Sequence, residues 1–367
     1  MARQMITGRA VWRGDELERA GDWIFWLSDA HQREIADALT RVRHAPLFGF
    51  GRDDFPLPRT TDLLAQVSDE LENGRGAARL RGLDVRRYSD DELRQIFWGI
   101  GQHLGTPVYQ NMSGEIMGEV RDETRDASPT FIDSGPGKIV SSRARARSTG
   151  PLRFHTDRCD VIGLMCVRNG IDGGVSKLAS IPTIHNEFLR RRPDLLELLF
   201  QEYWRMRPKD EDGVFAQPYF ALPVFGMRDG KITSQYSRTY VEQAQEFAEL
   251  PRLSKAQDEA LDLLAEIAEE TCLYSPFEPG DIQLLNNHVI YHGRTAYADD
   301  VAAGRARLLI RLWLAMPNGR ALPEGFDTFW GSIQPGALRG GVPQRDGSRT
   351  PAPAALGRER LLAATAR

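Results

Sequence analysis

The sequence of 367 residues lacks the features that mark several large classes of protein. It has only three cysteines, Cys159, Cys166 and Cys272, and no Cys-x-x-Cys pair, so neither a disulfide framework nor a zinc–cysteine site is expected. No run of about 18 apolar residues occurs, and no transmembrane helix is expected. The first residues also lack the apolar core of a signal peptide, which predicts a cytoplasmic protein.

The charge balance and the glycine pattern argue against two further classes. The chain has 47 Lys and Arg residues against 51 Asp and Glu, a net charge of −4, without the basic excess that is typical of nucleic-acid binding. No Gly-x-Gly-x-x-Gly or Walker-type loop follows a strand-like segment, so a nucleotide-binding fold is disfavoured. We therefore expect a small-molecule substrate, with no nucleic acid or membrane as partner, in a chain that is compatible with a homo-oligomer.

What the sequence does contain is a series of short strand-like runs with helices around them. The capping box of Ser89 and Glu92 predicts a helix that ends before Gly105, and Ser254 with Gln257 predicts a second helix start. Strands separated by turns and flanked by helices favour a mainly β fold, a jelly roll, over a wound parallel sheet. The strand-like runs are residues 116–123, 161–169, 175–180, 281–287 and 307–315.

Composition divides the chain into three parts. We expect an N-terminal extension over residues 1–60, a main domain over 61–334 and a flexible C-terminal tail over 335–367. The tail is rich in Gly, Pro, Ala and Arg, a composition that is typical of loosely packed chain. The basic segment 141–147 is expected to be a mobile loop that acts as a lid.

His155 and Asp157 form the first candidate for chemistry. On a strand, residues two apart share a face, so an imidazole and a carboxylate would offer two adjacent metal ligands. A third ligand from a distant strand would complete the facial triad of non-haem iron sites. His288 and His292 both fit this role by spacing, and the residues alone do not choose between them.

The segment 307–314 places two arginines on one face of a predicted strand. Its other face is wholly apolar, while Arg307 and Arg311 alternate with large hydrophobic residues. A buried arginine needs an anionic partner, and a planar guanidinium suits a carboxylate. That partner is either an internal Asp or Glu or a dicarboxylate cosubstrate.

In this order and spacing, the His-x-Asp pair, the distant histidine and the arginine resemble the iron(II)/2-oxoglutarate-dependent dioxygenases. The sequence is most similar to the taurine dioxygenase (TauD/TfdA), clavaminate synthase-like branch, from about residue 74 to 317. The resemblance implies a double-stranded β-helix core with helical insertions, and Fe(II), 2-oxoglutarate and O₂ as cofactor and cosubstrates. His155 and Asp157 match the family's His-x-Asp motif, and His292, followed by Gly-Arg-Thr-Ala-Tyr, matches its distal histidine in preference to His288.

The resemblance also implies residues for the cosubstrate. Arg311 matches the arginine that pairs with the distal carboxylate of 2-oxoglutarate, and Ser176 lies where a Thr or Ser hydrogen-bonds the same group. Arg307 would approach the other end of the cosubstrate. Two departures from the family pattern are Phe154, in place of a common Trp, and the long interval of 19 residues from His292 to Arg311.

The implied function is oxidative decarboxylation of 2-oxoglutarate coupled to hydroxylation, or a related C–H oxidation such as desaturation, of a small molecule. An anionic substrate would suit the arginines. Two alternatives are a cupin-like metalloenzyme independent of 2-oxoglutarate, which leaves Arg311 and Ser176 without a role, and a non-catalytic jelly-roll binding module. The candidates for substrate binding are Arg294, the alternating Tyr236, Arg238 and Tyr240 on one expected strand face, Gln110 and Asn111.

Overall fold

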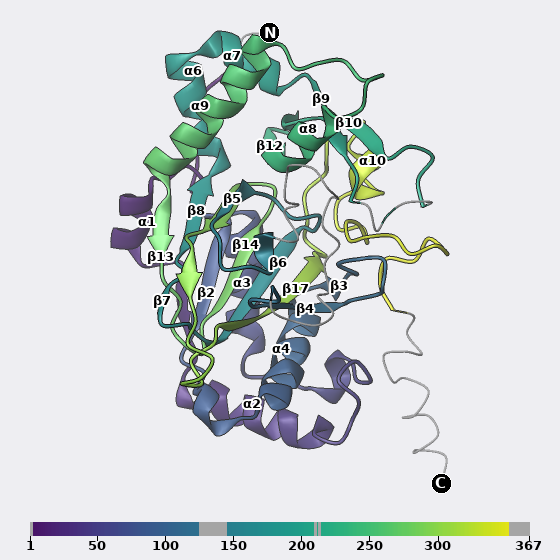
Figure 1. Ribbon diagram of the computed structural model, residues 1–367. Coiled ribbons are helices and arrows are strands. Elements are labelled where there is room, and N and C mark those ends of the chain that lie inside the picture. Colours follow the sequence, from purple (N-terminus) through teal and green to yellow (C-terminus); the bar gives the residue numbers. More distant parts are fainter. Residues whose placement is uncertain (1–2, 125–144, 209–210, 212–213, 352–367) are drawn as a thin grey trace.

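The computed structural model describes residues 3–124, 145–208, 211 and 214–351, and Figure 1 shows their arrangement. Two mainly antiparallel sheets face each other, and helices cover the outside of this sandwich. The helices are α1 (Gly14–Ala20), α2 (Asp29–Val42), α3 (Thr61–Glu72), α4 (Asp90–Leu104), α6 (Ile181–Arg191), α7 (Pro193–Leu199), α8 (Arg238–Ala244), α9 (Lys255–Thr271) and α10 (Asp327–Trp330). The expected mainly β, jelly-roll class with flanking helices is confirmed.

The larger sheet follows the order β1-β2-β14-β6-β17-β3, with β4 also paired to β17, and the smaller sheet follows the order β13-β8-β15-β5. The pair β1–β2 is parallel, and the other pairs of both sheets are antiparallel. The larger sheet consists of β1 (Ile24–Trp26), β2 (Ala77–Arg81), β3 (Thr106–Pro107), β4 (Met117–Val120), β6 (Val161–Arg168), β14 (Ile282–Asn286) and β17 (Leu308–Ala315). The smaller sheet consists of β5 (Leu152–His155), β8 (Ser176–Ser180), β13 (Leu273–Ser275) and β15 (Ile290–Arg294).

Three short two-stranded sheets complete the β structure of the described residues. The pair β9–β10 continues into the residues that line the site, and β11–β12 follows it directly along the chain. The pairs are β9 (Glu202–Met206) with β10 (Tyr219–Pro223), β11 (Phe225–Arg228) with β12 (Lys231–Ser234), and β7 (Asp172–Gly173) with β16 (Tyr297–Ala298).

The capping boxes begin their helices as the sequence predicts. The hydroxyl of Ser89 accepts from the backbone N–H of Glu92, and the Glu92 carboxylate accepts from the backbone N–H of Ser89. Ser254 and Gln257 form the same reciprocal pair at the start of α9. Each box satisfies two backbone groups at a helix end.

Strand β17 packs against the outer helices with one face and towards the smaller sheet with the other. Leu308, Ile310, Leu312 and Leu314 pack with the buried apolar residues of α2, α3 and α4. The alternate residues face the smaller sheet, because successive side chains of a strand point to opposite faces, and Trp313 belongs to the core between the sheets. The predicted division of 307–314 into an apolar face and an arginine-bearing face is confirmed.

The ends of the described chain pack onto the same body. Trp12 and Leu17 are buried in the same apolar cluster as residues of α6 and α9, and β1 joins the larger sheet. Arg339 and Val342 are fully buried, so residues 335–351 differ from the loose tail that their composition predicts. The rest of the predicted tail lies outside the described residues, and the boundaries at 60 and 334 stay predictions.

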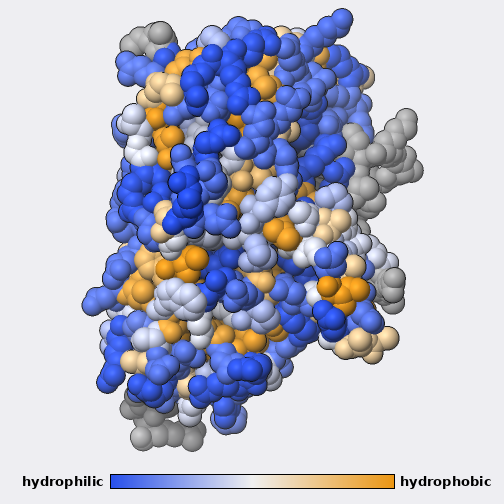
Figure 2. All heavy atoms as spheres, turned by 90° about the vertical axis from the view of Figure 1, so that its left-hand side faces the viewer, coloured by the Kyte–Doolittle hydropathy of each residue, from blue (hydrophilic) through white to orange (hydrophobic). Residues whose placement is uncertain are grey.

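Figure 2 shows one face of the molecule as mostly hydrophilic, with apolar residues in several small groups. Exposed large apolar side chains among the described residues include Trp26 and Tyr274. No helix of the described chain has the length and apolar character needed to cross a bilayer.

Candidate active site

The smaller sheet brings His155, Asp157 and His292 together. His155 is the last residue of β5 and pairs in register with His292 in the middle of β15. Asp157 lies two residues beyond the end of β5 rather than on the strand, yet its carboxylate still faces both imidazoles. One ligand atom from each of the three residues lies within 4.8 Å of the others.

The distances fit a facial set of metal ligands. The Nε2 atom of His155 is 3.8 Å from Oδ1 of Asp157, and Nε2 of His292 is 3.7 Å from Oδ2. Two imidazoles and one carboxylate on one side of a cavity are the donor set of non-haem iron(II) oxygenases. The residues present therefore fit an iron ion.

Neighbouring groups fix the orientation of the three side chains. Nδ1–H of His155 donates to the Arg153 carbonyl at 2.9 Å, which leaves Nε2 as the ligand atom. The indole Nε1–H of Trp313 donates to Oδ2 of Asp157 at 3.1 Å. The backbone N–H of Asp157 donates to Oδ1 of Asn287 at 2.9 Å.

The electrostatics favour the protonation states that bind a metal. Burial, together with the charge of His155, lowers the pKa of His292 to about 3, so its imidazole is neutral. Burial alone would raise the pKa of Asp157, but the positive charge of Arg311 and the hydrogen bond from Trp313 hold this pKa below its ordinary value. A neutral imidazole and a carboxylate are the forms that coordinate cations.

His288 belongs to a different, fully buried network. Its Nε2 lies 2.8 Å from Oδ1 of Asp160, and its Nδ1 lies 2.6 Å from the hydroxyl of Thr233. Arg339 donates to the same Asp160 oxygen at 2.8 Å. Both ring nitrogens of His288 are thus engaged away from His155 and Asp157, and the choice that spacing left open falls on His292.

Two pockets meet at the metal-ligand cluster. Both are lined by His155, Asp157 and Arg311. The first, here the Arg307 pocket, is also lined by Ser176, His292, Arg294 and Arg307. The second, here the Arg158 pocket, is the larger, with about 740 Å³ of space, open solvent included, against about 490 Å³.

The Arg307 pocket contains a buried cation with no anion. Arg307 is 2% exposed, and within the described chain its guanidinium makes no hydrogen bond or ion pair, while Nε is fully buried. Asp299 accepts from the backbone N–H of Arg307 rather than from the side chain. Burial lowers the pKa of Arg307. Ser176 lines the same pocket and accepts from Nε2 of Gln283 at 3.0 Å, which leaves its hydroxyl proton available.

Arg311 lies nearer to the ligand cluster than Arg307. Its charge acts on Asp157, whereas the charge of Arg307 acts on Arg294 and Tyr297. Arg307 directly precedes β17 and Arg311 lies on it four residues later, a separation of about 13 Å in extended chain. Arg311 thus lies at the junction of the two pockets, and Arg307 at the end of its own pocket.

The expected site residues Gln110 and Asn111 take supporting positions. Oε1 of Gln110 accepts from Nε of Arg311 at 2.7 Å, and its Nε2 donates to the Arg311 carbonyl at 3.0 Å. Oδ1 of Asn111 accepts from the backbone N–H groups of Ser113 and Glu115, a local turn. Neither residue lines the two pockets.

Arg294 lines the Arg307 pocket and also holds the chain that precedes β5. Its guanidinium donates to backbone carbonyls between residues 145 and 150, among them that of Ser148 at 2.7 Å. Burial lowers its pKa to about 10. In the described chain, the guanidinium of Arg294 thus pairs with backbone carbonyls rather than with a carboxylate.

The expected mobile loop 141–147 is described only in its last three residues. Arg147 forms ion pairs with Glu115 at 2.8 Å and with Glu123 at 2.7 Å. Residues 141–144 lie outside the described chain, and the role of the loop as a lid stays a prediction.

The expected strand over 236–240 is wrong. Arg238 is the first residue of α8, where residues two apart do not share a face. Tyr236 is buried, and Arg238 pairs with Glu242 at 3.1 Å and with Asp258 at the surface. Of the three expected residues, only Tyr240 lines the Arg158 pocket.

The model of the family described as "Taurine catabolism dioxygenase TauD, TfdA family" matches residues 41–313. The chain belongs to this family. This membership confirms the expected reaction class, an iron(II)- and 2-oxoglutarate-dependent dioxygenase.

Two curated relatives of this TauD/TfdA dioxygenase are similar over most of their length. "FR-33289 synthase" of Streptomyces rubellomurinus (strain ATCC 31215) is 32% identical over 344 residues, which cover 90% of this chain and 96% of the relative. "Taurine hydroxylase-like protein SAT17" of Stachybotrys chartarum (strain CBS 109288 / IBT 7711) is 31% identical over 314 residues, covering 84% of this chain and 79% of the relative.

Solved structures share the fold of this dioxygenase at low identity. An asparagine oxygenase in complex with Fe(II), 2S,3S-3-hydroxyasparagine and succinate superposes with a TM-score of 0.58 at 16% identity, over 80% of this chain and 93% of the other. The non-haem iron oxygenase OrfP in complex with Fe, succinate and (3S)-hydroxy-L-Arg gives 0.58 at 14% identity, over 79% and 94%.

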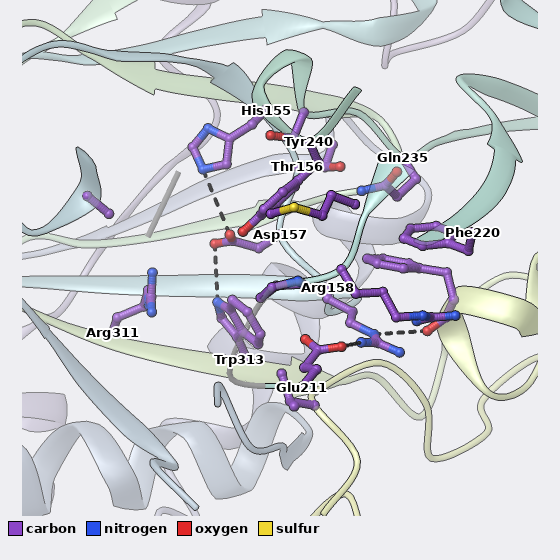
Figure 3. Close-up of a pocket in the computed structure, with 17 residues that line it drawn as sticks. His155, Thr156, Asp157, Arg158, Glu211, Phe220, Gln235, Tyr240, Arg311 and Trp313 are labelled. Atoms are coloured by element: carbon purple, nitrogen blue, oxygen red, sulfur yellow. Dashed lines mark hydrogen bonds and ion pairs between the residues drawn. The ribbon is translucent and has the colours of Figure 1, made fainter. Parts of the chain in front are cut away.

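Several residues that line the Arg158 pocket of this dioxygenase carry no motif in the sequence. Figure 3 shows His155, Asp157 and Arg311 towards one end of this pocket, and Arg158, Glu211 and Phe220 towards the other. Arg158 directly follows the His-Thr-Asp motif, the one signal that pointed to it. The other lining residues that sequence reasoning missed are Met206, Arg207, Pro208, Glu211, Phe220, Gln235, Ser237, Phe329 and Val342.

Proposed function

We propose that His155, Asp157 and His292 hold the iron of this dioxygenase, and that 2-oxoglutarate occupies the Arg307 pocket. The observation that carries this proposal is the buried, unpaired guanidinium of Arg307 in a pocket that also contains the metal-ligand cluster. An unpaired buried charge is costly, and a bound carboxylate compensates it. A metalloenzyme independent of 2-oxoglutarate, or a non-catalytic binding module, leaves this charge unexplained.

In this proposal, the two arginines bind opposite ends of the cosubstrate. Arg307 and Ser176 hold the distal carboxylate, because both line the end of the pocket away from the cluster. Arg311, the expected partner of that carboxylate, instead lies beside Asp157 and acts on the end of 2-oxoglutarate near the metal. Gln110 keeps Arg311 in this position through two hydrogen bonds.

The reaction consumes 2-oxoglutarate, O₂ and a substrate C–H bond, and gives succinate, CO₂ and the hydroxylated product. Iron supplies the activation of O₂ when it is bound. Asp157 contributes a carboxylate that Trp313 fixes in place, and the apolar walls of the Arg307 pocket, which include Leu164 and Leu309, exclude water from the cosubstrate.

Hydroxylation is the outcome that the similarities favour. The asparagine oxygenase and OrfP complexes contain succinate together with a hydroxylated amino acid. We propose the same type of product here, with a small molecule as substrate in the Arg158 pocket.

The free thiols of the three cysteines further support a reducing compartment such as the cytoplasm.

Anaerobic titration tests the proposal. Fe(II) followed by 2-oxoglutarate should give the weak visible charge-transfer band of the chelate in the wild-type protein. His292→Ala should lose the band, while the control His31→Ala, at the start of α2, should keep it. Iron binding without a band in the wild-type protein would contradict the cosubstrate assignment.

A further inference from the structure

The Arg158 pocket contains a second guanidinium that the proposed iron and 2-oxoglutarate sites do not use. Arg207 follows β9 and is 7% exposed. Nε and Nη1 of Arg207 are buried, and no group of the described chain accepts a hydrogen bond from them. Buried guanidinium N–H groups are almost always paired, because leaving them unpaired costs free energy.

Arg205 shows what a purely structural arginine looks like on the same strand. It lies two residues earlier and is fully buried, and its guanidinium donates to four backbone carbonyls, including those of Tyr203 at 3.1 Å and Gln235 at 3.0 Å. In the described chain Arg207 has no such partners, although it lines a pocket. The difference indicates a partner that the described residues do not supply.

Aromatic contacts do not satisfy Arg207. The guanidinium carbon lies 3.6 Å from the ring centre of Phe215 and 4.7 Å from that of Phe220. Such cation–π contacts use the flat face of the guanidinium, whereas its N–H bonds point outward in the plane of the group. The contacts therefore hold Arg207 in place and leave its N–H edge for a planar or tetrahedral anion.

The charges around Arg207 leave an excess of positive charge among the described residues. Glu211 is the nearby carboxylate, and it already pairs with Arg158 at 3.1 Å. Arg349 is also close enough to Arg158 and Glu211 for their charges to act on it. Burial and the charge of Arg158 lower the pKa of Arg207 to about 10, which still leaves the guanidinium charged at neutral pH.

The rest of the pocket wall is mixed, and one of its polar groups has no partner. Phe220, Phe329 and Val342 supply apolar surface, and Gln235 lines the same pocket, on the side of Phe220 in Figure 3. The side-chain oxygen of Gln235 is buried and has no hydrogen-bond partner in the described chain. A primary amide both donates and accepts, so it suits a hydroxyl or amide group of a ligand.

We propose that Arg207 binds an oxyanion of the primary substrate, at the end of the Arg158 pocket opposite the metal ligands. The substrate is then a small organic acid, a carboxylate or a phosphonate, with a short carbon chain along Phe220 and a polar group near Gln235. This inference rests on the proposed function, because it takes the oxidised carbon to lie at the His155 end. It assigns the specificity for the anionic end to a residue outside the metal and cosubstrate sites.

Calorimetric titration of the anaerobic protein, loaded with Fe(II) and saturating 2-oxoglutarate, tests this assignment. The probes are butyrate, propylphosphonate and the neutral butyramide. At least one anion should bind the wild-type protein and butyramide should not, and the two anions distinguish a carboxylate from a phosphonate. Arg207→Gln should weaken the anion at least tenfold, and Arg207→Lys should retain part of the affinity.

Two controls make the result specific. Arg19→Gln removes an exposed arginine that pairs with Asp15 on α1 and lines neither pocket, and it should bind the anions as the wild-type protein does. The charge-transfer band of the same samples reports on the cosubstrate site, so loss of the band would mark failure of the proposed function. An intact band, with no anion binding or with equal binding by wild type and Arg207→Gln, would overturn the Arg207 assignment alone.

Discussion

Replacing Arg307 by methionine should weaken 2-oxoglutarate binding without weakening the fold. The side chain is 2% exposed and has no hydrogen-bond or ion-pair partner among the described residues. Methionine keeps much of the volume and removes the unpaired charge, a change that is often neutral or stabilising. The free variant should therefore unfold at the same denaturant concentration as the wild-type protein, or at a higher one.

The effect on the cosubstrate follows from the lost carboxylate contact. A hydrogen bond to a charged group contributes about 2 kcal/mol, which corresponds to a dissociation constant raised about 30-fold. At a concentration of 100 times the wild-type constant, 2-oxoglutarate should stabilise the wild-type protein by about 2.7 kcal/mol and the variant by about 0.9 kcal/mol.

Denaturant unfolding with and without 2-oxoglutarate, under anaerobic conditions with Fe(II), measures both quantities. Arg19→Gln is the matched control, since it removes a surface arginine outside both pockets. Equal stabilisation of Arg307→Met and wild type would refute the cosubstrate assignment. A free variant that is several kcal/mol less stable would show that the charge of Arg307 has a structural partner.

Two further predictions concern residues around the site. Gln110→Leu removes both hydrogen bonds that hold Arg311 and should raise the KM for 2-oxoglutarate by about tenfold. Steady-state succinate release measures this KM, and an unchanged value would contradict the positioning role of Gln110. Asp160→Asn breaks the buried pair with Arg339 and should lower the free energy of unfolding at pH 7 by about 3 kcal/mol. Because partners hold the pKa of Asp160 below 3.8, the stability that its carboxylate contributes is present above this pH and is lost as pH falls through the folded pKa. Urea unfolding should therefore show a smaller stability difference between variant and wild type at pH 3 than at pH 7. An equal difference at both pH values would argue against a stabilising role of the Asp160 charge.

The sequence predicts those features that depend on local periodicity and on short motifs. The alternation of apolar residues and arginines in 307–314 indicated a strand with one face on the helices, and β17 has this arrangement. Ser89 and Ser254 begin their helices because the capping chemistry is complete within four residues. The His-x-Asp pair is likewise local, so the sequence predicts its two candidate ligands together.

Features that depend on distant contacts were not predictable in the same way. Arg307 and Arg311 share one strand face, and the position of the metal ligands relative to β17 decides which is nearer, a matter of sheet packing rather than of spacing. The segment around Arg238 fits a strand or a helix equally well, and ion pairs with α8 and α9 residues favour the helix. Arg207 carries no motif, and only the path of β9 to the pocket reveals it.

The position of β5 at the border of the smaller sheet has a mechanical consequence. Beyond β5 there is only an isolated bridge between His155 and Ser237, so in the described chain this strand has one full neighbour, β15. An ion that binds both His155 and His292 cross-links β5 to β15 through side chains as well as through the backbone. Metal binding therefore stabilises an edge strand, and slow amide exchange in Leu152–His155 should be observed only in the metal-loaded protein.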